Sequence, residues 1–452
     1  MTLKLPSFSQ AAALLLSGAA YAGLAYATPR TELGQLLGLF GVALVAYAWL
    51  LHSQLPLRWG LAAALLFRLL WLPALPALSD DVYRFHWDGL LVANGTNPFR
   101  YRPDEIIADG ARAALPNGEA RNQTLPQFQQ LYRKLNSPHY YSVYPPVSQL
   151  AFGVSATFFP SSERGFAVSL RLIILVFEAG VAALLLALLP ALGWVRRQAL
   201  RYLLHPLVII ELTGNLHFEA GVLCFVLLAI WLLLRQQGMK SAVALGLGVA
   251  TKLLPLLVLP LLVRRLGWRR TLVYGLLVTA TLLVLFSPFL SVDLFVNIGR
   301  SLKLYFRSFE FNASIYYMLR PVGYWLTTYN QIAIIGPALA LTAGLIGLGL
   351  AWRERHLTLA AFPPTFLLML TAYYGLATTV HPWYITLLVG LGTLSRFRFP
   401  LVWGGMAALS YSAYRTSAYT ENLWLVGLEY VIVYGVMLWE LSSHSNNRSQ
   451  PT

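Results

Sequence analysis

Apolar runs close to the thickness of a bilayer recur along almost the whole chain. A membrane-spanning helix needs about 20 mostly apolar residues. Hydrophobic residues make up 57% and charged residues 11% of the 452-residue sequence, whereas soluble domains carry roughly 25% charged residues. We therefore expect an all-α, polytopic integral membrane protein with about 11 to 14 membrane segments. The expected segments include residues 11–27, 33–51, 59–78, 168–189, 203–213, 220–234, 242–263, 272–288, 332–351, 357–379, 383–394, 401–414 and 423–441.

The positive charge of the chain is spread over short connectors between these runs. The net charge is +15, and arginines cluster within residues 196–201, 264–270, 353–356 and 396–398. Short basic loops mark the cytoplasmic side of a membrane protein. A nucleic-acid-binding protein would gather its basic residues on one surface, so we expect no nucleic-acid partner.

One long polar loop, residues 79–140, follows the third apolar run. It opens with the sequence SDDVYRFHWDG and contains many aromatic residues, which favour a partly ordered loop. Asp80 and Asp81 are expected at the membrane–water boundary, where burial raises the pKa of a carboxylate and lets it accept a proton. The alternative is that these acids do no more than begin a helix by capping its free N–H groups.

The two adjacent aspartates cannot address one substrate hydroxyl equally. Neighbouring residues on a helix point about 100° apart. We expect Asp80 to cap the following helix and Asp81 to act as the catalytic base. Asp88 lies seven residues beyond Asp81, on the same helical face, where it either orients an acceptor or is an ordinary surface residue.

Three cationic side chains are candidates for binding a phosphate. Lys252 lies in the middle of the apolar run 242–263, where an unpaired ammonium is costly and a bound anion would explain it. Arg84 and Arg320 are the other two candidates, since guanidinium groups bind phosphate oxygens strongly.

The segment 214–219 reads as the tip of a hairpin on the same side as Asp81. It carries His217 and Glu219. A His-x-Glu pair with no third ligand at a set spacing is a weak metal signal, so a hydrogen-bonded polar tip is the alternative, and we expect no metal or other cofactor.

Several stretches resemble blocks of a known family. SDDVYRFHWDG, with Asn97-Pro98-Phe99 shortly after it, is similar to the first outer loop of bacterial membrane-embedded GT-C glycosyltransferases, particularly the polyprenyl-phosphate-mannose-dependent mannosyltransferases. Later similar blocks are YPP at 144–146, GNLHFE at 214–219, TKLLP at 251–255, FEFN at 309–312 and HPWY at 381–384. The resemblance implies that Asp80 and Asp81 bind or deprotonate the acceptor. Contacts to the acceptor or sugar are expected from Asp88, His217, Glu219, Glu310, Asn312 and His381.

The resemblance also implies an organisation for the whole chain. We expect a single membrane-embedded glycosyltransferase domain, residues 1–452, in the bacterial inner (cytoplasmic) membrane, with its active site outside. Residues 79–140 form the first outer loop and residues 291–330 the second outer segment. Larger members of the family carry a soluble C-terminal domain, whereas only the short polar tail 442–452 follows the last apolar run here. Acceptor recognition is therefore expected in the membrane part, with a lipid-linked or glycan acceptor.

The expected chemistry is transfer of a sugar, mannose by resemblance, from a polyprenyl-phosphate donor to an acceptor hydroxyl. A single carboxylate base with direct displacement predicts inversion at the anomeric carbon. Two other classes stay open: a flippase or transporter of lipid-linked saccharides, which would show repeats in its two halves, and an O-antigen-type polymerase or ligase. Turnover of sugar by the purified protein separates the enzymes from the transporter.

Overall fold

The chain is helical throughout the part that the structure describes. This computed structural model describes residues 5–115, 117–416 and 419–446. Within these residues, extended pairing is limited to an isolated parallel bridge between Phe311 and Thr379. The expected all-α fold is confirmed.

Seven described helices are long and apolar enough to cross a membrane, and an eighth span results if one bent helix pair is counted as a unit. In that pair, residues Pro206–Gly214 and Glu219–Leu234 meet at an angle of 111°. The protein is thus an integral membrane protein. The seven helices are α1 (Phe8–Tyr26), α2 (Leu33–His52), α8 (Glu163–Ala191), α14 (Trp268–Phe286), α17 (Ile332–Arg353), α18 (Phe362–Leu376) and α21 (Leu423–Asn446).

The sequence predicts 11 to 14 segments, more than the candidate spans found among the described residues. The difference arises because several apolar runs fold into helices too short to span. At 1.5 Å per residue, the 12 residues of α19 rise only about 18 Å, against the ~30 Å of a hydrocarbon core. The third run ends early because Pro73 and Pro76 cannot continue a helix. The short helices of apolar sequence are α3 (Leu57–Leu70), α7 (Pro146–Phe158), α12 (Gly238–Val249), α19 (Pro382–Thr393) and α20 (Phe399–Met406).

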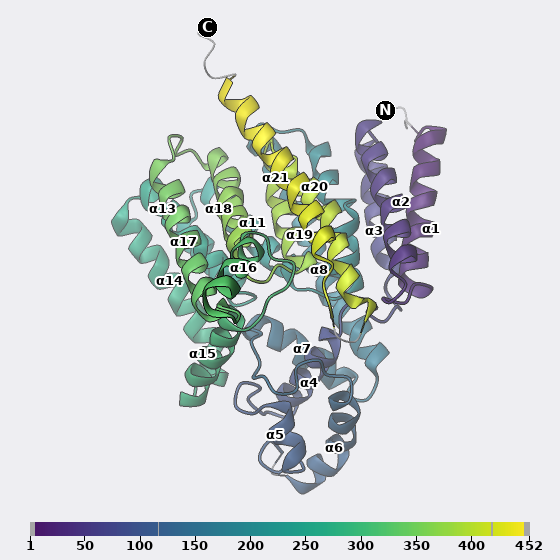
Figure 1. Ribbon diagram of the computed structural model, residues 1–452, viewed down its shortest axis with the longest axis vertical. Helices are drawn as coiled ribbons and strands as arrows, with labels where there is room; N and C mark the ends of the chain where they lie inside the picture. The colour runs from purple at the N-terminus through teal and green to yellow at the C-terminus, as the bar shows by residue number, and fades with distance from the viewer. Residues whose placement is uncertain (1–4, 116, 417–418, 447–452) are drawn as a thin grey trace.

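The first polar loop is an ordered helical layer at one end of the molecule. It contains α4 (Asp81–Ala93), α5 (Pro103–Ala108) and α6 (Gly118–Tyr132), and it lies at the end opposite the last turns of α21 (Figure 1). Gly89 lets α4 pack closely on α7, because a Cβ there would come within 2.5 Å of the Phe152 carbonyl oxygen. The remaining helices are α9 (Leu200–Leu203), α10 (Pro206–Val208), α11 (Glu219–Leu234), α13 (Leu259–Leu266), α15 (Val292–Arg307) and α16 (Ile315–Thr327).

Two buried networks pair ionisable residues inside the helical bundle. Arg68 donates to a Glu178 carboxylate oxygen at 2.5 Å, and the Tyr202 hydroxyl donates to the other oxygen at 2.6 Å. Arg171 donates to the carbonyls of Thr213 at 2.6 Å and Gly214 at 3.0 Å. These carbonyls lie at the break between α10 and α11, where the helix no longer satisfies them. Both networks stabilise the fold, and their side chains do not line either of the two cavities presented below.

Candidate functional site

A cavity of about 850 Å³ lies between the outer helical layer and the membrane bundle. Its walls come from the start of α4, the turn before α11, the break after α12, the end of α15, and the turn between α18 and α19. Eight of the residues expected at the site line it: Asp80, Asp81, Arg84, His217, Glu219, Lys252, Glu310 and His381. Three do not: Asp88, Asn312 and Arg320.

Asp80 occupies the position before α4 but does not cap the helix. Its side chain makes no capping hydrogen bond. It accepts instead from Arg30 at 2.6 Å and from the Tyr419 hydroxyl at 3.2 Å. The expected capping role is therefore wrong, because a cation from the connector between α1 and α2 competes for the carboxylate.

Asp81, the first residue of α4, is half-buried in the cavity wall. Burial raises the pKa of its carboxyl group above the usual value, and the nearby Asp80 raises it further. The imidazole of His217, a hydrogen bond from Asn136 and the ammonium of Lys252 oppose this rise. A carboxylate that is hard to keep ionised and open to a cavity is suited to accept a proton.

Lys252 lies in a break in the helical path. α12 ends at Val249, and a short 3-10 turn resumes at Leu254. The ammonium pairs with Glu219, the first residue of α11, and lies 4.0 Å from the centre of the Tyr384 ring. The expectation of an unpaired ammonium is wrong, since a residue 33 positions away supplies the counter-ion. The Lys252 side chain remains 37% exposed, on the cavity.

Aromatic rings form a continuous stack along one wall of the cavity. The His217 ring lies 3.9 Å from Trp383, Trp383 lies 4.3 Å from His381, and His381 lies 4.8 Å from Phe311. Tyr414 continues the stack beyond Phe311 at 6.1 Å. Burial lowers the pKa of His381 to about 3, so its ring is neutral at physiological pH.

His217 is also held from behind. Its Nε2 atom lies 3.3 Å from Glu211, and Tyr411 donates a hydrogen bond to the same carboxylate. Among the described residues, no group of three or more His, Cys, Asp and Glu side chains is arranged to hold a metal ion.

Arg84 and Asp88 form a buried pair beneath the cavity floor. Arg84 Nε donates to Asp88 at 2.9 Å, and Ser142 and Gln149 donate to the other carboxylate oxygen at 2.5 and 3.1 Å. Asp88 has no exposed surface. It therefore cannot touch an acceptor in this conformation, and Arg84 reaches the cavity already neutralised.

The FEFN segment contributes Phe309, Glu310 and Phe311 to the cavity wall. Glu310 pairs with Arg320 at 2.7 Å. The Asn312 side chain points into the bundle, where it donates to Glu429 at 3.2 Å. Backbone hydrogen bonds from Phe311 to Thr378 and from Val380 to Phe311, of 3.0 and 2.8 Å, join this segment to the turn that carries His381.

Sequence reasoning did not include several cavity residues as site candidates. Arg30 lies in a connector between two spans, and no local signal in the sequence indicates its role. Trp383 and Tyr384 lie in the HPWY block, in which only His381 was predicted to be a site residue. Tyr414 ends the apolar run 401–414 and Tyr419 follows it, and both reach the site only through the fold.

An all-α polytopic protein with an acidic residue and a cation facing one cavity at the end of its bundle fits the class of membrane-embedded glycosyltransferases that the sequence resembles, and the family comparison shows this class. The model of the family described as alpha-(1->6)-mannopyranosyltransferase, N-terminal domain, matches residues 6–267, more than half of the 452-residue chain. The chain belongs to this family and is a mannosyltransferase. No curated protein matches the chain.

The matched region carries most of the polar part of the cavity. Asp80, Asp81, His217, Glu219 and Lys252 fall within residues 6–267. Glu310, His381 and the aromatic wall beyond His217 lie outside it. The acid and the cation of the site thus belong to the family-matched part of the chain.

Proposed function

We propose that the protein transfers mannose from a polyprenyl-phosphate donor to an acceptor hydroxyl on the extracytoplasmic side of the bacterial inner membrane, with inversion. The observation that carries this proposal is that Asp81, with its raised pKa, and Lys252 open onto one cavity. The apolar and aromatic walls of this cavity suit a lipid-borne sugar. The acceptor is lipid-linked or a glycan.

The reaction needs one proton acceptor and one site for the leaving phosphate. Asp81 takes the proton from the acceptor hydroxyl while the acceptor oxygen forms a bond to the anomeric carbon. The bond between that carbon and the phosphate oxygen breaks, and the phosphate departs with the electron pair. Lys252 stabilises the negative charge on the departing phosphate. Because one carboxylate acts in a direct displacement, the anomeric configuration inverts.

The other cavity residues have binding and positioning roles in this proposal. The rings of Trp383 and the neutral His381 offer a flat face against which a sugar can stack. Glu219 holds Lys252, and Glu310 binds the acceptor. Asp88, Asn312 and Arg320 support the cavity wall from behind and act as positioning residues.

The donor is the first point to test. Purified protein in detergent is supplied with polyprenyl-phosphate mannose or with a nucleotide-linked mannose, and an acceptor glycan. The proposal predicts transfer of single mannose units from the lipid donor alone. Transfer only from the nucleotide sugar, transfer of whole saccharide blocks, or sugar movement across vesicles without turnover would contradict it.

The distribution of positive charge supports the proposed side of the membrane. The connectors at the end of the bundle away from α4–α6 carry the arginine clusters, and an ion pair of 2.5 Å between Arg265 and Glu354 joins two of them. Basic short loops stay in the cytoplasm. In a Cys224→Ser background, an impermeant maleimide on intact cells is expected to label Arg112→Cys and not Arg269→Cys. The reverse pattern would overturn the orientation.

A further inference from the structure

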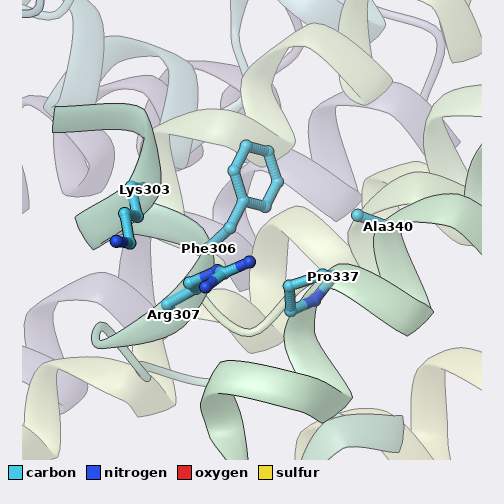
Figure 2. A pocket seen from close by; sticks show the side chains of 5 residues that line it. All are labelled: Lys303, Phe306, Arg307, Pro337 and Ala340. Atoms are coloured by element: carbon cyan, nitrogen blue, oxygen red, sulfur yellow. The ribbon is translucent and has the colours of Figure 1, made fainter. Parts of the chain in front are cut away.

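A second cavity, of about 590 Å³, lies between α15 and α17. Figure 2 shows Lys303, Phe306 and Arg307 on one wall, with Pro337 and Ala340 across from them. Phe306 and Ala340 also line the main cavity. The two cavities therefore adjoin, and we name the second, which lies beside the cavity of Asp81 and Lys252, the side passage.

Among the residues that the structure describes, no carboxylate forms an ion pair with either cation of this passage. Lys303 and Arg307 are exposed and one helical turn apart on the same face of α15. Neither has a hydrogen bond or ion pair to another described residue. Like charges at this spacing destabilise a helix slightly, so their placement is unfavourable unless an anion is present.

The cations that line the main cavity are different. Arg30 pairs with Asp80, Arg84 with Asp88 and Lys252 with Glu219. Each of these three cations already has a carboxylate partner in the free protein. An incoming anion at the side passage, in contrast, competes with no carboxylate of the described part of the chain.

The position of the passage suits the headgroup of a lipid. α17 is a candidate span that begins at Ile332, and Pro337 and Ala340 lie in its second and third turns. Leu341, next to Ala340 on α17, is 67% exposed, and Phe295 in the first half of α15 is 69% exposed. Cations next to exposed apolar residues at the end of a span recognise a phosphate that carries a hydrocarbon tail.

We propose that Lys303 and Arg307 form a capture site for the phosphate of the polyprenyl-phosphate donor, which enters the main cavity sideways between α15 and α17. This proposal rests on the proposed function. In it the two cations bind the lipid before reaction, and Lys252 stabilises the phosphate during reaction. Lys303 and Arg307 are positioning residues, because they act on donor binding and not on the reacting bond.

The test compares Lys303→Gln/Arg307→Gln with the control Arg112→Gln/Arg133→Gln, which removes two exposed cations of the outer layer. Loss of the capture site is expected to raise the KM for the lipid donor roughly tenfold, with kcat unchanged. Wild-type KM should rise with salt, and the variant should lose that dependence. An unchanged KM in the active variant, or an equal rise in the control, would overturn the capture site.

Binding without turnover separates this inference from the proposed function. Labelled polyprenyl phosphate is bound to each protein and competed with phosphatidylglycerol or inorganic phosphate. The wild type is expected to prefer polyprenyl phosphate, and the double variant to bind it roughly tenfold less tightly. Equal competition by phosphatidylglycerol or by inorganic phosphate would contradict recognition of the polyprenyl chain. A wild type that binds the lipid through these residues but transfers no mannose would refute the proposed function alone.

Discussion

Buried charges occur in two regions of this molecule, and the two regions treat them differently. In the bundle, Glu178 accepts hydrogen bonds from Arg68 and Tyr202, and Arg171 donates to backbone carbonyls. At the cavity, Asp81 is half-buried with a raised pKa, and Lys252 keeps an exposed face beside its partner Glu219. Both regions contain carboxylates and cations, but the degree to which these groups are paired differs.

This difference separates structural charges from reactive ones. A buried ion pair with every hydrogen-bonding group satisfied holds helices together and has nothing to offer a ligand. A carboxylate that is desolvated, next to a cavity and only partly compensated can exchange a proton with a substrate. Ionisable residues in apolar runs therefore indicate function only when their partners are known.

The largest expected effect is the loss of turnover when the cavity carboxylate of Asp81 is changed. Asp81→Asn removes the proposed base and is expected to lower kcat by about 10²–10⁴-fold, the usual contribution of general-base catalysis. Asp80→Asn is the matched control, and it should cost much less because Asp80 is bound to Arg30 and Tyr419. Turnover at saturating lipid donor measures both. If both variants keep nearly full activity, the base is elsewhere, and Glu219 or Glu310 is the next candidate.

The next largest expected effect is a loss of stability when the buried pair of Arg68 and Glu178 is broken. Arg68→Met leaves the Glu178 carboxylate without its cation in the bundle, and removing one partner of a buried pair costs about 3–5 kcal/mol. A clear fall in the thermal midpoint in detergent is expected, while the folded fraction keeps its kcat. Arg269→Met, at an exposed connector residue, should leave the midpoint unchanged. A stable Arg68→Met protein with lost turnover would instead place Arg68 in catalysis.

A smaller effect on the kinetic constants is expected at Lys252, the cation that is only partly paired. Lys252→Met should raise the KM for the lipid donor and lower kcat, each by roughly tenfold, because an exposed charge is weakened by solvent. Lys252→Arg keeps the charge and should recover part of the loss. Steady-state kinetics over a range of donor concentrations measures both constants. Wild-type values in a well-expressed Lys252→Met protein would remove Lys252 from the site.

The smallest effect is a shift in the pH profile. Asp81 must be ionised to act as a base, so the rate should fall as pH falls through its pKa, which burial raises above the ~3.9 of a free aspartate. His381, with a pKa of about 3, stays neutral and adds no step near neutral pH. The profile of kcat/KM against pH tests this. An acidic limb that persists in Asp81→Asn would assign it to another group.

The sequence predicts the parts of this site that are local. Asp80 and Asp81 stand out because they interrupt an apolar chain, and Lys252 because it lies within an apolar run. Their partners are not local: Arg30 and Asp80 are 50 positions apart, and Tyr419 and Asp80 are 339 apart. Pairing across such distances depends on helix packing, so neither the lost cap at Asp80 nor the counter-ion of Lys252 could be read from the sequence.

The fold, too, is predictable from the sequence only where the signal is local. Hydropathy identifies apolar runs well, which is why the all-α membrane class is confirmed. It cannot separate a span from a short buried helix such as α19, because both are apolar on every side. The resemblance added the family, whose model matches residues 6–267. It did not identify the side passage at Lys303 and Arg307, which exists only where α15 meets α17.

The most direct test of the central claim is a matched pair of carboxylate-to-amide changes, Asp81→Asn and Glu178→Gln, with turnover and thermal midpoint measured on the same preparations. Raised pKa at Asp81 means that its ionised form costs stability near neutral pH, so Asp81→Asn should lose turnover and keep or raise its midpoint. Glu178→Gln leaves Arg68 buried without a counter-charge and should lower the midpoint while the folded protein still transfers mannose. If both variants lose stability and activity together, or if Glu178→Gln alone loses turnover, the distinction between structural and reactive charges is contradicted.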